Sequence, residues 1–185
     1  WRKAQKGGGK SSHVHQEWVN FKDISPYLAG AVLVSEDINF WEHSGYDWHE
    51  IKRAIRTDIR KKRFSRGAST ITQQLARNLF LSAEKTPIRK LREFFIARKL
   101  ERELSKIRIL ELYLNWVEWG DGIFGIQAAS WNYFEKPAWE LWPEEAVRLV
   151  SALPNPKKLP PFSESAHLKR KRNLILQRMF KYGMI

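Results

Sequence analysis

The sequence predicts a mainly α-helical fold, and three observations indicate it. Apolar residues recur at three- and four-residue steps, as in Trp48, Ile51, Ile55 and Ile59. Residues that favour helix N-caps precede several of the expected helices. No run alternates between apolar and polar residues as a half-buried strand would.

The expected elements follow from local signals in chain order. Residues 1–20 are polar and contain three consecutive glycines, which is typical of a flexible lead-in, so we expect the folded domain at 21–185. Asp47 and Glu50 predict a capping box at the start of the first clear helix. A second helix is expected from near Ser69. Thr86 followed by Pro87 then predicts a helix that runs to about Glu103.

The second half of the chain continues in the same way. Ser105 is expected to begin a helix that spans Ile107 to about Trp116, and three glycines predict a loop at 120–125. Further helices are expected at about 126–134, 143–153 and 164–182. We find no internal repeat.

Charge and composition limit the function classes. Lys and Arg number 33 against 20 Asp and Glu, a net charge of +13, so we expect an anionic partner: nucleic acid, lipid headgroups or a phosphorylated substrate. The absence of cysteine excludes a disulfide framework and a thiolate metal site. No run of about 18 apolar residues predicts a membrane span. The chain begins without Met or a signal sequence, so we expect that a membrane anchor was removed or lies upstream.

Several weaker patterns are better explained by chance or by structure. The run from Ala4 to Ser11 resembles a phosphate loop, but no apolar strand precedes it. The histidine pairs lack the spacing of a zinc site, so we expect no metal ligands among the site residues. Basic clusters at 60–63 and 169–172 occur without any recognised nucleic-acid module, and we expect no nucleic-acid partner.

Two segments carry the chemistry. Glu36 and Asp37 lie just after the apolar run 31–34, where partial desolvation suits one carboxylate to act as a base. The segment from Ser69 to Gln74 is rich in neutral hydrogen-bonding side chains, which indicates a polar ligand. Cations follow it, and Arg89 and Glu93 share one helix face, a spacing that taken alone indicates a plain surface ion pair.

Together these residues resemble the family 51 glycosyltransferases. This family includes the monofunctional biosynthetic peptidoglycan transglycosylases and the glycosyltransferase domains of class A penicillin-binding proteins. Four ordered motifs carry the resemblance: Glu36, Asp37, Phe40, His43, Gly45 and Asp47; Gly67 to Gln74; Arg89, Lys90 and Glu93; and Ile109 to Asn115. The likeness covers about residues 20–156. Arg77 departs from it, because Lys is more usual there.

The resemblance implies glycosyl transfer with inversion from a polyprenyl-diphosphate-linked glycan to lipid II. Glu36 is implied as the base on the acceptor hydroxyl, and Glu93 as the second catalytic carboxylate near the donor. The implied substrate-binding residues are Ser69, Thr70, Gln73, Gln74, Arg77, Asn78, Lys85, Arg89 and Lys90. The implied supporting residues are Asp37, Phe40, His43, Gly45 and Gly67. No organic cofactor is implied, and the resemblance leaves open a divalent cation, Mg²⁺ or Mn²⁺.

The resemblance also implies a place in the cell. It implies a lysozyme-like helical domain with a small mobile subdomain that faces the membrane, at about residues 48–66. The catalytic domain would stand on the periplasmic face of a bacterial inner membrane, held by a single N-terminal anchor. The membrane surface is an implied partner, and contacts with other cell-wall synthesis or division proteins stay open.

Two other classes remain open from the residues alone. A lysozyme-like lytic enzyme that cleaves glycan would need a protonated carboxylic acid at the glycosidic oxygen. A non-catalytic basic module that binds membrane or nucleic acid would need neither glutamate.

Overall fold

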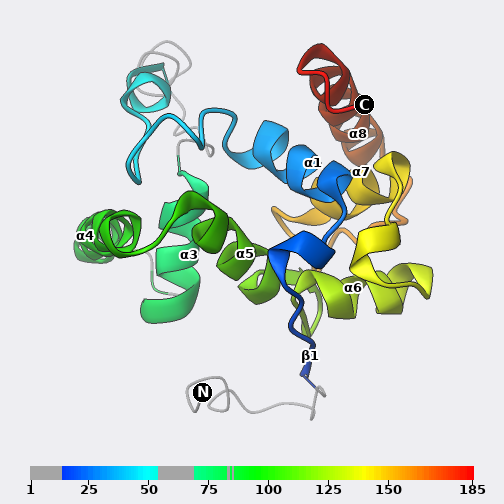
Figure 1. The fold of residues 1–185 in the computed structure, drawn as a ribbon, viewed down its shortest axis with the longest axis horizontal. Helices are drawn as coiled ribbons and strands as arrows, with labels where there is room; N and C mark the ends of the chain where they lie inside the picture. Colours follow the sequence, from blue (N-terminus) through cyan, green and yellow to red (C-terminus); the bar gives the residue numbers. More distant parts are fainter. Residues whose placement is uncertain (1–13, 54–68, 83, 85) are drawn as a thin grey trace.

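The computed structural model describes residues 14–53, 69–82, 84 and 86–185 (Figure 1). The described part is mainly helical, which confirms the predicted fold class. Its helices are α1 (Pro26–Glu36), α3 (Ile71–Phe80), α4 (Pro87–Glu103), α5 (Lys106–Trp116), α6 (Ile126–Phe134), α7 (Pro143–Ala152) and α8 (Ala166–Lys181), with short 3-10 helices η1 (Phe21–Asp23) and η2 (Ala138–Glu140). Its strands are β1 (His15–Gln16), β2 (Glu118–Gly120) and β3 (Ile123–Phe124).

Most of the predicted helices are confirmed, because their boundaries depend on local caps. The side chain of Thr86 accepts from the backbone N–H of Arg89, with Pro87 at the first helical position. Ser105 caps α5 in the same way, through the N–H of Arg108. Asp47 accepts from the N–H groups of His49 and Glu50, and residues 48–53 are helical. The continuation of that helix through Ile55 and Ile59 lies outside the described residues.

Two parts of the fold differ from the sequence-based prediction. The apolar run 31–34 belongs to α1, so helical structure begins well before Asp47. The helix was not recognised because residues 28–34 are all buried and leave no amphipathic pattern. The predicted loop at 120–125 contains β3, which pairs antiparallel with β2 and parallel with β1. Strands of two or three residues are too short to show alternation, and a partner far away in sequence determines them.

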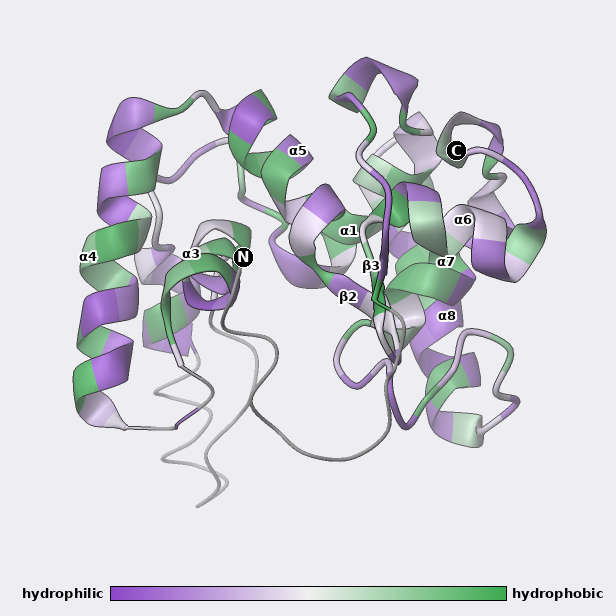
Figure 2. Ribbon diagram, turned by 90° about the horizontal axis from the view of Figure 1, so that it is seen from below, coloured by the Kyte–Doolittle hydropathy of each residue, from purple (hydrophilic) through white to green (hydrophobic). Residues whose placement is uncertain are grey.

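The helices form two groups joined by α5. On one side, α1 packs against α7 and α8, and α7 against α8. On the other side, α3 packs against α4 and α5. Figures 1 and 2 both show α3 and α4 at one end of the molecule, and α6, α7 and α8 at the other. The C-terminal end of α1 points toward α3, which brings the end of the buried helix to the region between the two groups.

Residues 14–20, which the sequence assigns to the lead-in, contact the domain. Besides the pairing of β1 with β3, Asn115 binds the backbone of Val19 through both its amide nitrogen and its oxygen, each at 2.9 Å. Glu111 accepts from the N–H of Phe21 at 2.8 Å. Within the described ranges, no helix has the length and apolar character needed to cross a bilayer. Except for 48–53, the membrane-facing segment expected at 48–66 lies outside the described residues.

Candidate active site

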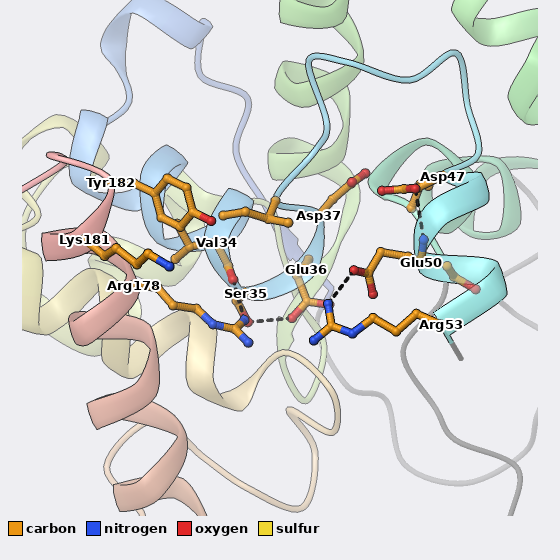
Figure 3. A pocket seen from close by; sticks show the side chains of 13 residues that line it. Val34, Ser35, Glu36, Asp37, Asp47, Glu50, Arg53, Arg178, Lys181 and Tyr182 are labelled. Carbon is orange, nitrogen blue, oxygen red and sulfur yellow. Dashed lines mark hydrogen bonds and ion pairs between the residues drawn. The ribbon is translucent and has the colours of Figure 1, made fainter. Parts of the chain in front are cut away.

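The last residue of α1, Glu36, lies in a pocket of about 510 Å³ (Figure 3). The wall of the pocket comes from the end of α1, the helical turn at 48–53, the start of α3 and the end of α8. Figure 3 shows Glu36 between Arg178 and Lys181 on one side and Glu50 on the other. The Glu36 side chain is 16% exposed, so its carboxylate is largely shielded but reachable from the pocket.

Three polar groups contact the Glu36 carboxylate. Ser35 Oγ donates to Oε1 at 2.9 Å, and Gln74 Nε2 donates to Oε2 at 3.4 Å. The third group is Lys171 Nζ on α8, 3.6 Å from Oε1. A carboxylate at a helix C-terminus faces the negative end of the helix dipole, so these donors offset an unfavourable position for the ionised form.

A short chain of contacts connects Glu36 to Glu93. Gln74 Nε2 also donates to the backbone oxygen of Ser69 at 3.4 Å. Ser69 Oγ in turn accepts from Lys90 Nζ at 2.9 Å, and Lys90 forms an ion pair with Glu93. These contacts therefore link the two carboxylates that the sequence predicts to be catalytic, although Gln74, Lys90 and Glu93 are not among the residues that line the pocket around Glu36.

Glu93 is fully buried and holds two cations. Arg89 Nη1 lies 2.9 Å from Glu93 Oε2, while Lys90 contacts Oε1. The Arg89 side chain is 15% exposed and that of Lys90 is 51% exposed, so both cations reach further toward solvent than the carboxylate does. A buried carboxylate is tolerated only when it is paired, and here it fixes where the two positive charges lie.

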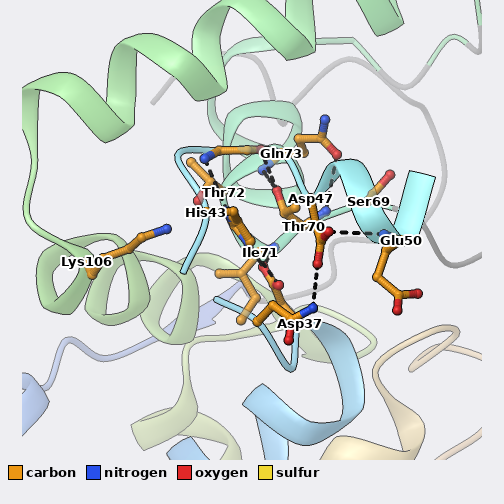
Figure 4. A network of polar contacts seen from close by, with 12 residues as sticks. Asp37, His43, Asp47, Glu50, Ser69, Thr70, Ile71, Thr72, Gln73 and Lys106 are labelled. Carbon is orange, nitrogen blue, oxygen red and sulfur yellow. Dashed lines mark hydrogen bonds and ion pairs between the residues drawn. The ribbon is translucent and has the colours of Figure 1, made fainter. Parts of the chain in front are cut away.

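The first-motif residues hold the start of α3 in place (Figure 4). Asp37 Oδ2 accepts from the N–H of Ile71 at 2.9 Å, and the Asp37 carboxylate also lies 2.9 Å from His43 Nε2. Because the N–H of Gly45 donates to His43 Nδ1 at 3.2 Å, the ring proton is on Nε2 and points to Asp37. Phe40 is fully buried in the core beside this network.

Gly45 occupies a position that other residues cannot take without strain. Its φ is +94°, and a Cβ there would lie 3.3 Å from the backbone of Ala97 on α4. Its carbonyl oxygen accepts from Thr70 Oγ1 at 2.7 Å. The loop after α1 is therefore held close to both α3 and α4.

Two of the predicted substrate-binding residues, Thr70 and Gln73, use their side-chain polar atoms for hydrogen bonds within the protein. Thr70 is the N-cap of α3, and Thr70 and Gln73 form a reciprocal capping box between side chain and backbone. Both side chains are buried. Arg77 is half-buried and Asn78 is exposed, further along α3. Gly67 and Lys85 lie outside the described residues.

Sequence reasoning missed the contribution of α8 to the pocket. Lys171 contacts Glu36, Arg178 Nη1 donates to the backbone oxygen of Val34 at 2.8 Å, and Lys181 lines the pocket. The signal was present, because positions 171, 178 and 181 fall on one face of the helix predicted at 164–182. Without the tertiary structure, nothing indicated that this face would meet the end of α1.

Three ionisable groups near the pocket have shifted pKa values. Burial lowers the pKa of Lys171, an effect that the neighbouring Glu36 only partly offsets. Burial raises the pKa of Tyr113 well above its usual value, and the charge of Glu36 adds to this rise. For Asp47, burial would raise the pKa, but hydrogen bonds from Asn39 and from the N–H groups of Glu50 and His49 outweigh it and bring the pKa below its usual value.

The described residues contain no group of three or more His, Asp or Glu side chains arranged to hold a metal ion. The divalent cation, Mg²⁺ or Mn²⁺, was left open by the resemblance, and the described residues assign it no group of ligands.

Comparison with known proteins agrees with the motifs. Residues 4–180 match the model of the transglycosylase family. The chain is 44% identical over 169 residues to the biosynthetic peptidoglycan transglycosylase of Nitrosomonas eutropha, covering 91% of this chain and 69% of that protein. It is also 44% identical over 168 residues to the protein of the same name from Chromobacterium violaceum, covering 91% of this chain and 74% of the relative. With the family model matching nearly the whole chain and these two relatives so similar, the chain belongs to the transglycosylase family.

Proposed function

We propose that this protein is a peptidoglycan glycosyltransferase of the cell envelope, which polymerises lipid II into glycan strands. The observation that carries the proposal is the contact chain from Glu36 through Gln74, Ser69 and Lys90 to Glu93. It joins a carboxylate that can take up a proton to a group of cations that can bind a diphosphate. The names of the relatives, biosynthetic peptidoglycan transglycosylases, support the same activity.

In the proposed reaction, Glu36 acts on the acceptor and the cations around Glu93 act on the donor. Glu36 removes the proton from the acceptor hydroxyl, whose oxygen then attacks the anomeric carbon of the donor. The bond from that carbon to the diphosphate breaks on the opposite face, so the configuration inverts. The diphosphate leaves as an anion and needs no proton, and Arg89, Lys90 and Arg77 stabilise its charge.

Glu93 acts through its two cations in this proposal. It is fully buried, whereas Lys90 is half-exposed, so the cation rather than the carboxylate can meet a ligand. One carboxylate between two cations leaves a net positive charge at the surface of α4. Ser69 lies beside Lys90 and can bind a diphosphate oxygen when the lysine does.

The outer face of α4 supports contact with an anionic membrane. Ile88, Leu91 and Phe95 are 66%, 58% and 61% exposed, although they are large and apolar. Arg92 and Lys99 are exposed on the same face. An apolar stripe beside Lys and Arg is typical of helices that lie in the headgroup region of anionic lipid. The polyprenyl chain of the substrate stays in the bilayer, so catalysis at this surface fits the proposed reaction.

The test is polymerisation of lipid II by the purified chain. Glu36→Gln should lower the rate of polymerisation by at least about 100-fold, because the amide cannot accept the proton. Glu140→Gln, an exposed glutamate in η2 outside the pocket, serves as the matched control and should polymerise at the wild-type rate. Near-wild-type turnover by Glu36→Gln would remove Glu36 as the base.

The same assay separates the competing classes. A lytic enzyme would release fragments from finished glycan, whereas a polymerase lengthens chains from lipid II. A lytic enzyme needs a protonated acid, yet Glu36 contacts Lys171 and Glu93 is paired with Arg89 and Lys90. A simple binding module would show no turnover even as the wild-type protein, and it would keep its membrane affinity after replacement of both glutamates.

A further inference from the structure

Tyr113 is a buried polar residue that the proposed reaction does not yet use. It lies on α5, is 1% exposed, and is among the largest fully buried side chains of the described core. Its hydroxyl donates to Gln74 Oε1 at 3.3 Å. The ring therefore packs in the core while its one polar atom reaches the residue that contacts Glu36.

The amide of Gln74 has three partners that match its two ends. Its Nε2 faces two acceptors, Glu36 Oε2 and the backbone oxygen of Ser69, and its Oε1 faces the Tyr113 hydroxyl. If the Gln74 amide were rotated by 180°, its oxygen would face the Glu36 carboxylate and the Ser69 carbonyl. Both of these groups are acceptors, so neither could donate to the amide oxygen. The orientation of the Gln74 amide thus follows from all three contacts, and Tyr113 provides the one that comes from the core.

The need for this contact is greatest when the reaction occurs. Once Glu36 has taken a proton, its carboxyl group can donate as well as accept, so Glu36 no longer selects the N–H end of the amide. The contacts with Ser69 and Tyr113 then maintain the orientation of the Gln74 amide. The N–H end therefore stays at Glu36 and is in place to donate when the carboxylate forms again.

We propose that Tyr113 is a positioning residue for glycosyl transfer: its hydroxyl holds the Gln74 amide with the N–H end against Glu36. The inference depends on the proposed function, because it assumes that Glu36 is the base. The raised pKa of Tyr113, caused mainly by burial, agrees with it, since the hydroxyl keeps its proton and remains a donor.

The first test is Tyr113→Phe, which keeps the ring and removes only the hydroxyl. The rate constant kcat for lipid II should fall by roughly three- to tenfold, the factor that one hydrogen bond represents. KM should stay within about twofold, because no contact with substrate is lost. Tyr133→Phe removes a hydroxyl on α6, a helix that contributes nothing to the pocket wall, and should leave both constants unchanged. Thermal unfolding of each variant shows that the rates refer to folded protein.

A double-mutant cycle then identifies how Tyr113 acts. Gln74→Met removes the amide with little change in length, and Tyr113→Phe should have no further effect on kcat in that background. Additive effects of the two changes, or a rise in KM with unchanged kcat, would overturn the inference. If the wild-type protein builds no polymer, both the proposed function and this inference are wrong. If the wild-type protein is active but the effects of Tyr113→Phe and Gln74→Met are additive, only this inference is wrong.

Discussion

Glu36 shows how a single residue depends on its surroundings. It ends α1, whose residues 28–34 are buried, and there the backbone carbonyls at the negative end of the helix dipole make the charge of a carboxylate unfavourable. Arg178 binds one of these carbonyls, at Val34, while Lys171 and Gln74 contact the Glu36 carboxylate itself. The Glu36 carboxylate is thus supported from α8 on one side and from α3 on the other.

Asp47 gives a prediction at the same scale. Its pKa in the folded protein lies below the usual 3.8, so its charge stabilises the fold fully above about pH 4. This contribution is lost as the pH falls through the lower, folded-state pKa. Asp47→Asn should cost about 1 kcal/mol at neutral pH, and the difference from wild type should shrink in acid.

Urea unfolding at about pH 7 and about pH 3 measures this effect. The control is Asp121→Asn, because the side chain of Asp121 is 75% exposed and should not matter at either pH. A cost for Asp47→Asn that is the same at both pH values would show that charge is not the cause.

At the scale of elements, α4 has two different faces. Its inner face carries the buried Glu93 and Ala97 and packs against α3. Its outer face carries exposed Ile88, Leu91 and Phe95 with Arg92 and Lys99. One helix therefore carries both the cations proposed to bind the diphosphate and an exposed apolar surface, and this fits the proposed reaction, whose substrate is held by lipid.

Phe95→Ser tests the outer face. The change removes an exposed ring, so folding should be unaffected while binding to phosphatidylglycerol-containing vesicles weakens about tenfold or more. Vesicle sedimentation measures the binding. Phe162→Ser, an exposed phenylalanine in the loop before α8, should bind as wild type does. Equal binding of all three proteins would exclude this face of α4 as the membrane contact.

At the scale of the whole molecule, Asn115 joins parts that lie far apart in sequence. It is fully buried on α5 and binds Val19 with both ends of its amide, next to the pairing of β1 with β3. Glu111 binds Phe21 one turn earlier. This part of the fourth motif holds the segment that leads into the domain, and neither Glu111 nor Asn115 lines the pocket.

Asn115→Ala should therefore destabilise the protein more than it affects the chemistry. Loss of a buried amide leaves the backbone of Val19 without partners, at a cost of about 2–4 kcal/mol in the free energy of unfolding. Urea unfolding measures it, with Asn132→Ala at an exposed position of α6 as the control. A cost below about 0.5 kcal/mol would mean that residues 14–20 contribute little to the fold.

Much of the helical structure was predictable because its signals are local. Thr86 with Pro87 and Ser105 with Lys106 set helix starts within a few residues, and the structure places α4 and α5 there. The start of α3 was nearly right for the same reason. The buried helix α1 and the strand β3 were missed, because their stability comes from contacts with distant residues rather than from local pattern.

The sequence by itself determined the family and the order of its motifs, and it predicted the residues proposed to carry the chemistry, because these depend on residue type and spacing. Only the tertiary structure decided that Lys171 meets Glu36, that Tyr113 reaches Gln74, and that Glu93 is buried behind its two cations. The physical reason is that helix boundaries follow from interactions within a few residues. Which helix faces meet depends on how the buried apolar surfaces of the whole chain pack together.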